Sequence, residues 1–225
     1  LIEIATAPDI HRPDVIKEVA EHIGMALRSL DNVKRGLGTI RQDVNISIEK
    51  GVRVEIKGAQ DLKMLPALAR NEMLRQHNML QIFEELERRG ASADNPIVDI
   101  TDTLRDSSSN VIRSALENEQ GAVLAVKLQG YAGITGLEVQ PGRRYGSELS
   151  DHAKLMGVKG LFHADELPNY GITEEEKQTI FKTLEAHPET YNFLLIAAEK
   201  KMATRAIDAA IEAAKASKLE KCVRQ

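Results

Sequence analysis

Residues 41–58, RQDVNISIEKGVRVEIKG, contain two stretches in which apolar and polar residues alternate. Alternation at a period of two predicts β-strands that bury one face. A three-residue loop at 49–51 places Gly51 at the third loop position, where a left-handed backbone conformation is needed. The apolar cross-strand pairs are then Ile48 with Val52, Ile46 with Val54 and Val44 with Ile56. We therefore predict a β-hairpin with one apolar face.

The opposite face of this hairpin carries charged and amide side chains. Its expected cross-strand pairs are Ser47 with Arg53, Asn45 with Glu55 and Asp43 with Lys57, and Arg41 lies at its end. Asp and Asn are poor strand formers, so their presence needs a reason. Two interpretations stay open from the pattern alone. One is a solvated sheet face; the other is a site whose carboxylates and cations bind a metal–nucleotide complex and orient a carbonyl group.

Length and composition are those of an ordinary globular protein. The 225 residues are 42% hydrophobic and 28% charged, which allows one large domain or two ordinary ones. The net charge of −4 does not by itself indicate nucleic-acid binding, and the single Cys222 excludes an intrachain disulfide. No apolar run approaches the roughly 18 residues of a membrane span, so we expect a cytoplasmic protein. The opening LIEIA, without Met, suggests an internal piece of a longer chain.

The first half of the chain is expected to combine short strands with two helices. We expect a buried strand at 1–5, a helix at 11–30, the hairpin, and a long helix at 61–89 that Gly90 ends. ASADNP, residues 91–96, is rich in turn formers and predicts a domain boundary between residues 90 and 103. The expected domains are therefore 1–95 and 105–218.

The second half alternates strands with helices. We expect helices at 109–117, 147–157, 172–187 and 189–217, and strands at 122–128 and 158–164. Thr173 and Glu176 form a capping box at the start of one helix. The alternation predicts an α/β (α+β) fold, in which the second domain is a two-layer sandwich of antiparallel sheet and helices.

Two sets of motifs resemble a known family. LIEIATAPDI, GTIRQDVNISI and GVRVEIKGAQDL resemble the cradle domain of the glutamyl-tRNA(Gln) amidotransferase B/E subunits. GAVLAVKLQGYAG and YGSELSDHAKLMGVKGLFHADELPNYGIT resemble the domain inserted in the archaeal E branch and in bacterial aspartyl-tRNA synthetase. The resemblance covers nearly all of the chain and implies part of a cradle domain followed by this insertion domain.

The resemblance implies an ATP-dependent ligase of protein biosynthesis. Such a protein phosphorylates the side-chain carboxylate of Glu-tRNA(Gln) with ATP and Mg²⁺, and ammonia from an asparaginase-like amidase D subunit then displaces the phosphate. The site residues it implies are Glu3 and Asp43 for Mg²⁺, Arg41 and Lys57 for phosphate charge, and Asn45 and Glu55 for orienting substrate or ammonia. The family's pocket also uses an N-terminal strand outside this chain, so we expect the fragment alone to be inactive.

PGRRYG, residues 141–146, is a candidate tRNA-binding loop. Arg143 and Arg144 could contact phosphates and Tyr145 could stack on a base, although a solvated turn is equally open. HADE, residues 163–166, lacks a third ligand at metal-site spacing, so we expect it to be structural. The alternative function is a non-catalytic tRNA-binding or assembly module, which the second half favours because it shows no convergent catalytic set.

Overall fold

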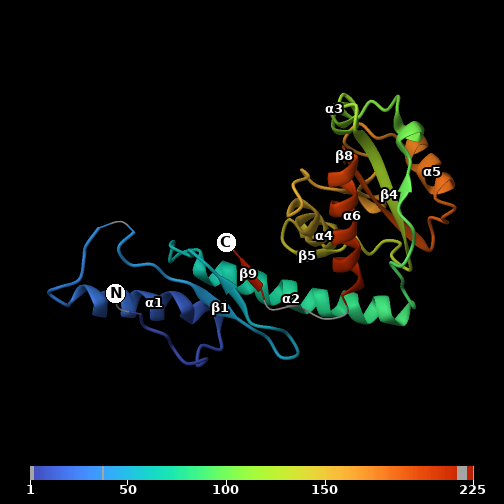
Figure 1. Ribbon diagram of the computed structural model, residues 1–225. Coiled ribbons are helices and arrows are strands. Elements are labelled where there is room, and N and C mark those ends of the chain that lie inside the picture. The colour runs from blue at the N-terminus through green and yellow to red at the C-terminus, as the bar shows by residue number, and fades with distance from the viewer. Residues whose placement is uncertain (1–2, 37, 217–221, 225) are drawn as a thin grey trace. The chain divides into compact units, whose positions relative to one another are not determined.

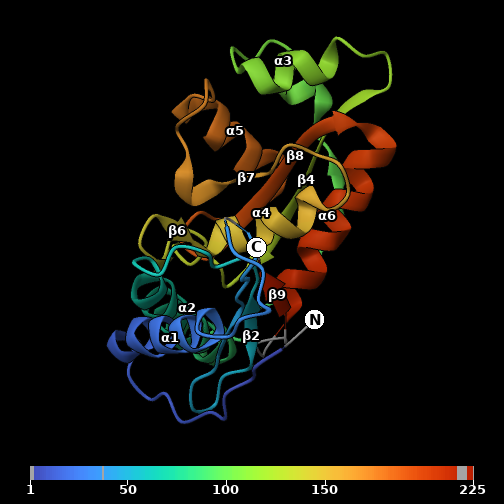
Figure 2. The same cartoon turned by 90° about the vertical axis from the view of Figure 1, so that its left-hand side faces the viewer.

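The computed structural model describes residues 3–36, 38–216 and 222–224 (Figures 1 and 2). The chain divides into two compact units. One comprises Leu1–Asn78 and Leu219–Gln225, and the other comprises Met79–Lys218. The division falls within a long helix, so that helix contributes to both units. The expected domain bounds, 1–95 and 105–218, stay a prediction.

The first unit contains two helices and a small sheet. Its elements are α1 (Pro13–Arg28), β1 (Val44–Ile46), β2 (Val54–Ile56), the first part of α2 (Leu65–Arg88) and β9 (Cys222–Arg224). Strand β2 lies between the other two strands, antiparallel to β1 and parallel to β9. A segment from the end of the chain thus completes a sheet that begins near its start.

The register of the hairpin is confirmed, but its turn differs from the prediction. Val44 pairs with Ile56 and Ile46 with Val54. The left-handed residue is Lys50, at φ 62°, and not Gly51. Gly51 is needed for another reason, because a Cβ atom there would lie 2.3 Å from Gln76 Oε1. The turn is closed by a hydrogen bond of 3.0 Å from the Gly51 amide to the Ile48 carbonyl oxygen.

Helix α1 and the segment before it are less buried than the sequence suggests. The apolar stripe of α1 is only half-buried, and the helix has no fully buried residue. The buried strand expected at 1–5 is wrong for residues 3–5, which are exposed and belong to no strand; Leu1 and Ile2 lie outside the described residues. Three residues without a neighbouring strand cannot form a ladder.

Helix α2 begins later than predicted and ends where expected. Asp61 Oδ1 accepts the Lys63 amide at 2.9 Å, so residues 61–64 form a turn before the helix. Pro66 lies at the start, where its missing amide hydrogen is tolerated. Gly90, at φ 58°, ends the helix with the left-handed conformation typical of glycine at this position.

The second unit is built on an antiparallel four-stranded sheet. Its strands are β3 (Val98–Asp99), β4 (Gly121–Gln129), β8 (Tyr191–Glu199) and β7 (Phe162–His163), in that spatial order, with β5 (Glu138–Gln140) and β6 (Arg143–Arg144) forming a separate pair. Its further helices are α3 (Asn110–Leu116), α4 (Tyr145–Lys154), α5 (Glu174–Thr183) and α6 (Lys200–Lys215), with 3₁₀ turns at Thr101–Leu104 and Ala164–Glu166. The antiparallel α/β class is confirmed.

The helix expected at 189–217 is wrong over its first part. Residues 191–199, YNFLLIAAE, form strand β8, which pairs with all nine residues of β4. The helix begins only at Lys200. A continuous apolar run fits a strand buried on both faces as well as a buried helix, and the pairing with β4 decides between them.

Helices cover both faces of this sheet (Figure 1). One face packs against α3 and α5 through a core that includes Ile112, Val123, Ala125, Ile180, Phe181, Phe193 and Leu195. Helix α6 packs on β4 and β8 and also contacts α4. Its buried positions are mostly alanine, which lets the helix approach the strands closely. The expected two-layer sandwich therefore carries a further helical layer.

Residues 91–96, the segment expected as a linker, are joined to strand β4 of this sheet by hydrogen bonds. Ser92 and Gln129 exchange two backbone hydrogen bonds of 2.9 and 3.0 Å, and Ala93 is buried. Strand β3 pairs with β4. Residues 91–99 therefore belong structurally to the second unit.

Candidate functional site

The polar face of the hairpin brings together most of the predicted catalytic side chains. Asn45 lies directly opposite Glu55 in the ladder. Lys57 Nζ lies 3.6 Å from Glu55 Oε1, and both side chains are partly exposed. Lys57 therefore pairs with Glu55 rather than with Asp43, its expected partner. The face offers a carboxylate, an amide and an ammonium group side by side.

Asp43 has a structural contact that the sequence did not reveal. Its Oδ1 accepts the Gly58 amide at 2.9 Å, at the open end of the hairpin where Gly58 adopts φ 68°. The other carboxylate oxygen, Oδ2, has no hydrogen-bond partner among the described residues. Arg41 is exposed near this end of the hairpin. Asp43 can thus hold the backbone with one oxygen and bind a ligand with the other.

The predicted magnesium ligands are Asp43 and Glu3. Glu3 is exposed in the segment before α1, and no contact joins it to Asp43 in the part of the chain that the structure describes. Across the same residues, no group of three or more His, Cys, Asp or Glu side chains could hold a metal ion. Mg²⁺ usually takes only one or two protein carboxylates besides substrate phosphates. The exposed Asp43 carboxylate is compatible with such a site, and the pair stays a prediction.

A groove lies beside the hairpin turn. It has a volume of about 630 Å³ and is lined by Ile48, Glu49, Lys50, Met73, Leu74 and His77. Leu74 is 42% exposed there. The groove runs between the turn and helix α2, both within the first unit.

The predicted tRNA-binding loop is largely occupied by internal contacts. Arg143 Nε donates to Glu148 Oε1 at 2.5 Å, and its Nη2 donates to Asp151 Oδ2. Burial lowers the pKa of Arg143, but the bonds to Asp151 and Glu148 together raise it above its ordinary value. Tyr145 is 1% exposed, so the expectation that it stacks on a base does not hold. Of the three predicted residues, only Arg144 is exposed.

The HADE segment forms a buried polar network, as expected for a structural element. Thr135 Oγ1 donates to Asp165 Oδ2 at 2.7 Å and lies 3.0 Å from His163 Nδ1. Asn192 Nδ2 also donates to Thr135 Oγ1, at 2.9 Å. Because the single Thr135 proton goes to Asp165, His163 must donate from Nδ1. Gly146 leaves room for the ring, since a Cβ atom there would lie 2.2 Å from His163 Nε2.

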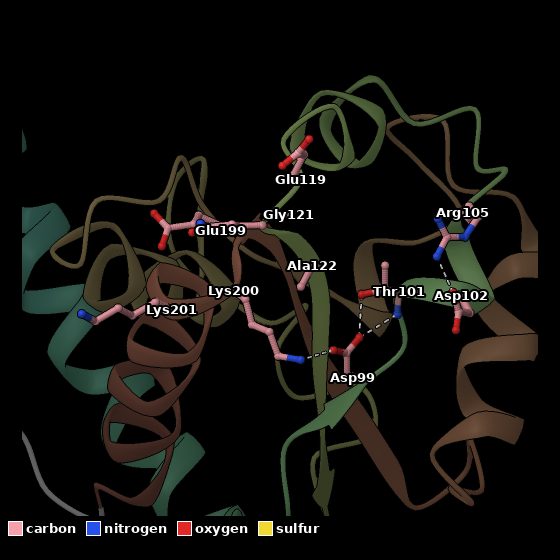
Figure 3. A pocket seen from close by; sticks show the side chains of 11 residues that line it. Asp99, Thr101, Asp102, Arg105, Glu119, Gly121, Ala122, Glu199, Lys200 and Lys201 are labelled. Carbon is pink, nitrogen blue, oxygen red and sulfur yellow. Dashed lines mark hydrogen bonds and ion pairs between the residues drawn. The ribbon is translucent and has the colours of Figure 1, made fainter.

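A polar cleft lies where β4 meets the start of α6 (Figure 3). Its volume is about 840 Å³. Asp99 is its central side chain: Oδ2 pairs with Lys200 Nζ at 2.8 Å and Oδ1 accepts from the Thr101 hydroxyl at 2.5 Å. These bonds lower the pKa of Asp99 to about 2. Asp102 and Arg105 form a second pair at 2.5 Å. Within each of these two pairs the opposite charges neutralise one another.

Comparison with known proteins decides which of these regions belongs to a known domain. The family described as the GatB/GatE catalytic domain matches residues 1–121. The chain belongs to this family. A second family, described as the GAD domain, matches residues 112–207. The hairpin therefore lies in the GatB/GatE catalytic domain, and the Arg143 loop and His163 network lie in the GAD domain.

Curated relatives agree with this assignment. The chain is 50% identical over 216 residues to the E subunit of glutamyl-tRNA(Gln) amidotransferase from Methanocaldococcus jannaschii, covering 96% of this chain and 34% of the relative. It is 52% identical over 215 residues to the protein of the same name from Methanosarcina acetivorans, again covering 96% and 34%. The chain spans about a third of the length of these relatives.

The GatB/GatE catalytic domain also contains buried polar residues that sequence reasoning missed. Glu72 and Arg75 are each 3% exposed on α2, and Gln76 is fully buried. Polar residues at helical spacing are normally assigned to the solvated face, and no signal in the pattern marks these three as buried.

Of the helices within 3–36, 38–216 and 222–224, none has the length and apolar character needed to cross a membrane.

Proposed function

We propose that this chain forms part of the protein that converts Glu-tRNA(Gln) to Gln-tRNA(Gln). The observation that carries the proposal is the match of residues 1–121 to the GatB/GatE catalytic domain. This range contains the hairpin whose polar face holds Asp43, Asn45, Glu55 and Lys57. The names of the relatives support the choice of substrate.

The proposed reaction has two steps. A side-chain carboxylate oxygen of the tRNA-bound glutamate attacks the γ-phosphorus of ATP, the bond to the bridging β,γ-oxygen breaks, and ADP leaves. Ammonia then attacks the acyl carbon, the C–O bond to phosphate breaks, and nitrogen loses a proton to a base. Phosphoryl transfer depends mainly on positioning and charge neutralisation, and the hairpin face offers both cations and hydrogen-bonding groups.

Each of the six predicted catalytic side chains has a proposed role. Lys57, held beside Glu55, and Arg41 would neutralise phosphate charge. Asn45 and Glu55 would orient the substrate carboxyl group or the incoming ammonia. Asp43 and Glu3 would hold Mg²⁺, which when bound supplies positive charge to the transferring phosphate.

The proposal includes a partner that supplies ammonia. This would be an asparaginase-like amidase D subunit, since the residues of the hairpin face include no activated nucleophile of the kind that amide hydrolysis needs. Because the substrates would be ATP and Glu-tRNA(Gln), we expect the protein to act in the cytoplasm.

The test is to substitute Asp43 in the full-length protein assembled with its partners. Asparagine keeps an Oδ1 acceptor for the Gly58 amide but removes the charge. We expect Asp43→Asn to change the free energy of unfolding by less than about 0.5 kcal/mol and to lower the amidation rate by roughly 100-fold. Ser47→Ala, at an exposed position on the same face, is the matched control. A near-normal amidation rate for Asp43→Asn would support the alternative interpretation, in which the face is only a solvated surface.

A binding or assembly role is the second candidate, for the second unit alone. Its buried Thr135 and Asn192 are hydrogen-bonded to each other and Thr135 to Asp165, whereas Arg144 is exposed and available for a phosphate. tRNA affinity that falls with Arg144→Ala and is unaffected by Asp43→Asn would support this role.

A further inference from the structure

Glu72, Arg75 and Gln76 of helix α2 form a buried polar network that ends on the hairpin. Arg75 Nε and Nη2 donate to the two carboxylate oxygens of Glu72, both at 2.9 Å. Gln76 Nε2 donates to Glu72 Oε1 at 2.9 Å. Gln76 Oε1 in turn accepts the Val52 amide at 3.0 Å, immediately after the hairpin turn. A chain of bonds therefore connects the ion pair on α2 to the backbone of the hairpin.

Glu72 fixes which way round the Gln76 amide lies. A carboxylate only accepts hydrogen bonds, so the nitrogen of Gln76 must face Glu72. The oxygen of Gln76 then points to the Val52 amide. Arg75 holds Glu72 through two parallel bonds, a geometry that restrains the carboxylate in position and in orientation. The ion pair thus leaves the glutamine with one orientation, in which it can bind the hairpin.

The hairpin needs contacts of this kind because its ladder is short. Strands β1, β2 and β9 have three residues each, and such short strands supply few ladder bonds. At the open end of the hairpin, Gln42 Nε2 donates to the Ala59 carbonyl oxygen at 2.6 Å and Asp43 accepts the Gly58 amide. At the turn end, the hydrogen bond that the Val52 amide donates to Gln76 Oε1 holds the hairpin in a similar way.

Gly51 shows independently that the turn and Gln76 are closely fitted. A Cβ atom at residue 51 would lie 2.3 Å from Gln76 Oε1 and 2.6 Å from Ile48 Cγ1. The backbone of Gly51 is not left-handed, so glycine is required here by the close approach and not by conformation. A methyl group at residue 51 therefore cannot fit unless the Gln76 amide oxygen and the Ile48 side chain move.

We propose that Gln76, oriented by Glu72 and Arg75, is a positioning residue that sets where the polar face of the hairpin lies relative to α2. Val52 lies two residues before β2, which contains Glu55 and is followed directly by Lys57, so a shift at the turn moves both side chains. The inference rests on the proposed function, in which Lys57 neutralises phosphate charge and Glu55 orients the substrate carboxyl group or ammonia. Gln76 itself is fully buried and touches no substrate.

The test compares two ways of breaking this contact in the full-length protein with its partners. Gln76→Met removes both amide bonds at similar volume, and Gly51→Ala places a methyl group against Gln76 Oε1, where it disturbs the bond from the Val52 amide while Gln76 is kept. Hydrogen exchange of residues 48–52, measured by mass spectrometry, should become at least about tenfold faster in both variants. The kcat of amidation should fall about 10- to 100-fold, while KM for Glu-tRNA(Gln) stays within about twofold.

A matched control separates positioning from general stability. Leu65→Val removes one buried methylene group from the same helix and should lower the melting temperature without changing exchange at 48–52 or kcat. Unchanged exchange at 48–52 in both test variants would overturn the proposed contact. Faster exchange with a normal kcat, in a protein whose Asp43→Asn variant is inactive, would overturn the positioning role but not the proposed function. If Asp43→Asn is itself active, the proposed function fails and the positioning role fails with it.

Discussion

At the scale of single residues, His163 shows how burial fixes a protonation state. Its side chain is 5% exposed and donates from Nδ1 to Thr135. Burial lowers the pKa of His163 to about 4; the nearby Asp165 carboxylate raises it and Arg144 lowers it. Glu166 Oε2 lies 3.8 Å from Nε2, and burial raises the pKa of this carboxyl group. The network is therefore built for a neutral imidazole ring.

This histidine predicts a pH dependence of stability. As the pH falls, the unfolded state binds a proton near the ordinary pKa of 6.5, before the folded state does. The contribution of His163 to the free energy of unfolding should be fully present above pH 6.5. It should decline toward pH 4 by an amount of the order of 3 kcal/mol. The free energy of unfolding, measured with urea at several pH values between 4 and 6.5, should depend less steeply on pH for His163→Gln than for the unsubstituted protein. His152→Gln, at an exposed position of α4, is the control. The same pH dependence of the free energy of unfolding in H163Q and in the unsubstituted protein would contradict the prediction.

At the scale of elements, the start of α5 is a case where sequence and structure agree in detail. Glu176 N donates to Thr173 Oγ1 at 3.1 Å, and Thr173 N donates to Glu176 Oε2 at 2.6 Å. The capping box predicted from two residues three positions apart is therefore confirmed. Such local signals are reliable because both partners lie within one turn of the chain.

The capping box yields a stability prediction. Thr173→Ala leaves the Glu176 amide without its partner and should lower the free energy of unfolding by about 1 kcal/mol. Thr179→Ala is the matched control, because the Thr179 hydroxyl donates only to the Glu175 carbonyl oxygen within the same helix. Chemical denaturation of both variants would give the difference, and an equal effect of the two substitutions would refute a specific capping role.

The hairpin and β8 show where prediction from sequence succeeds and where it fails. Alternation over residues 44–56 was enough to predict the register, since a slip by one residue would bury the charged face. Residues 191–199 carry no such alternation, and only pairing with β4 makes them a strand. The burial of Glu72, Arg75 and Gln76 likewise depends on tertiary packing, which helical periodicity does not encode. For the candidate site, the sequence predicted the polar face but not the Gln76 contact or the role of Asp43 at Gly58.

At the scale of the whole molecule, limited proteolysis should begin where the chain is exposed and held by few hydrogen bonds. The loop between α1 and β1 includes the exposed Lys34 and Arg35. Arg89, by contrast, donates to the carbonyl oxygens of Gly130 and Ala132 and pairs with Glu85. Trypsin should therefore cut at Lys34 or Arg35 before it cuts at Arg89. Mass analysis of early digestion products checks the order of cleavage. First cleavage at Arg89 would show that its hydrogen bonds to Gly130 and Ala132 break readily.

The chain by itself should not form Gln-tRNA(Gln), because its proposed site is open to water. Arg41, Asp43 and Asn45 are exposed, whereas an acyl phosphate must be shielded from hydrolysis until ammonia arrives. The chain also covers only 34% of the Methanocaldococcus jannaschii relative, so other parts of such a protein are available to cover the face. The assay supplies ATP, Mg²⁺, Glu-tRNA(Gln) and ammonium chloride, which removes the need for an amidase, and compares this chain with the full-length protein. We expect amidation by the full-length protein only. Circular dichroism should confirm that the isolated chain is folded, and amidation by the folded chain at a rate near that of the full-length protein would show that the hairpin face needs no cover.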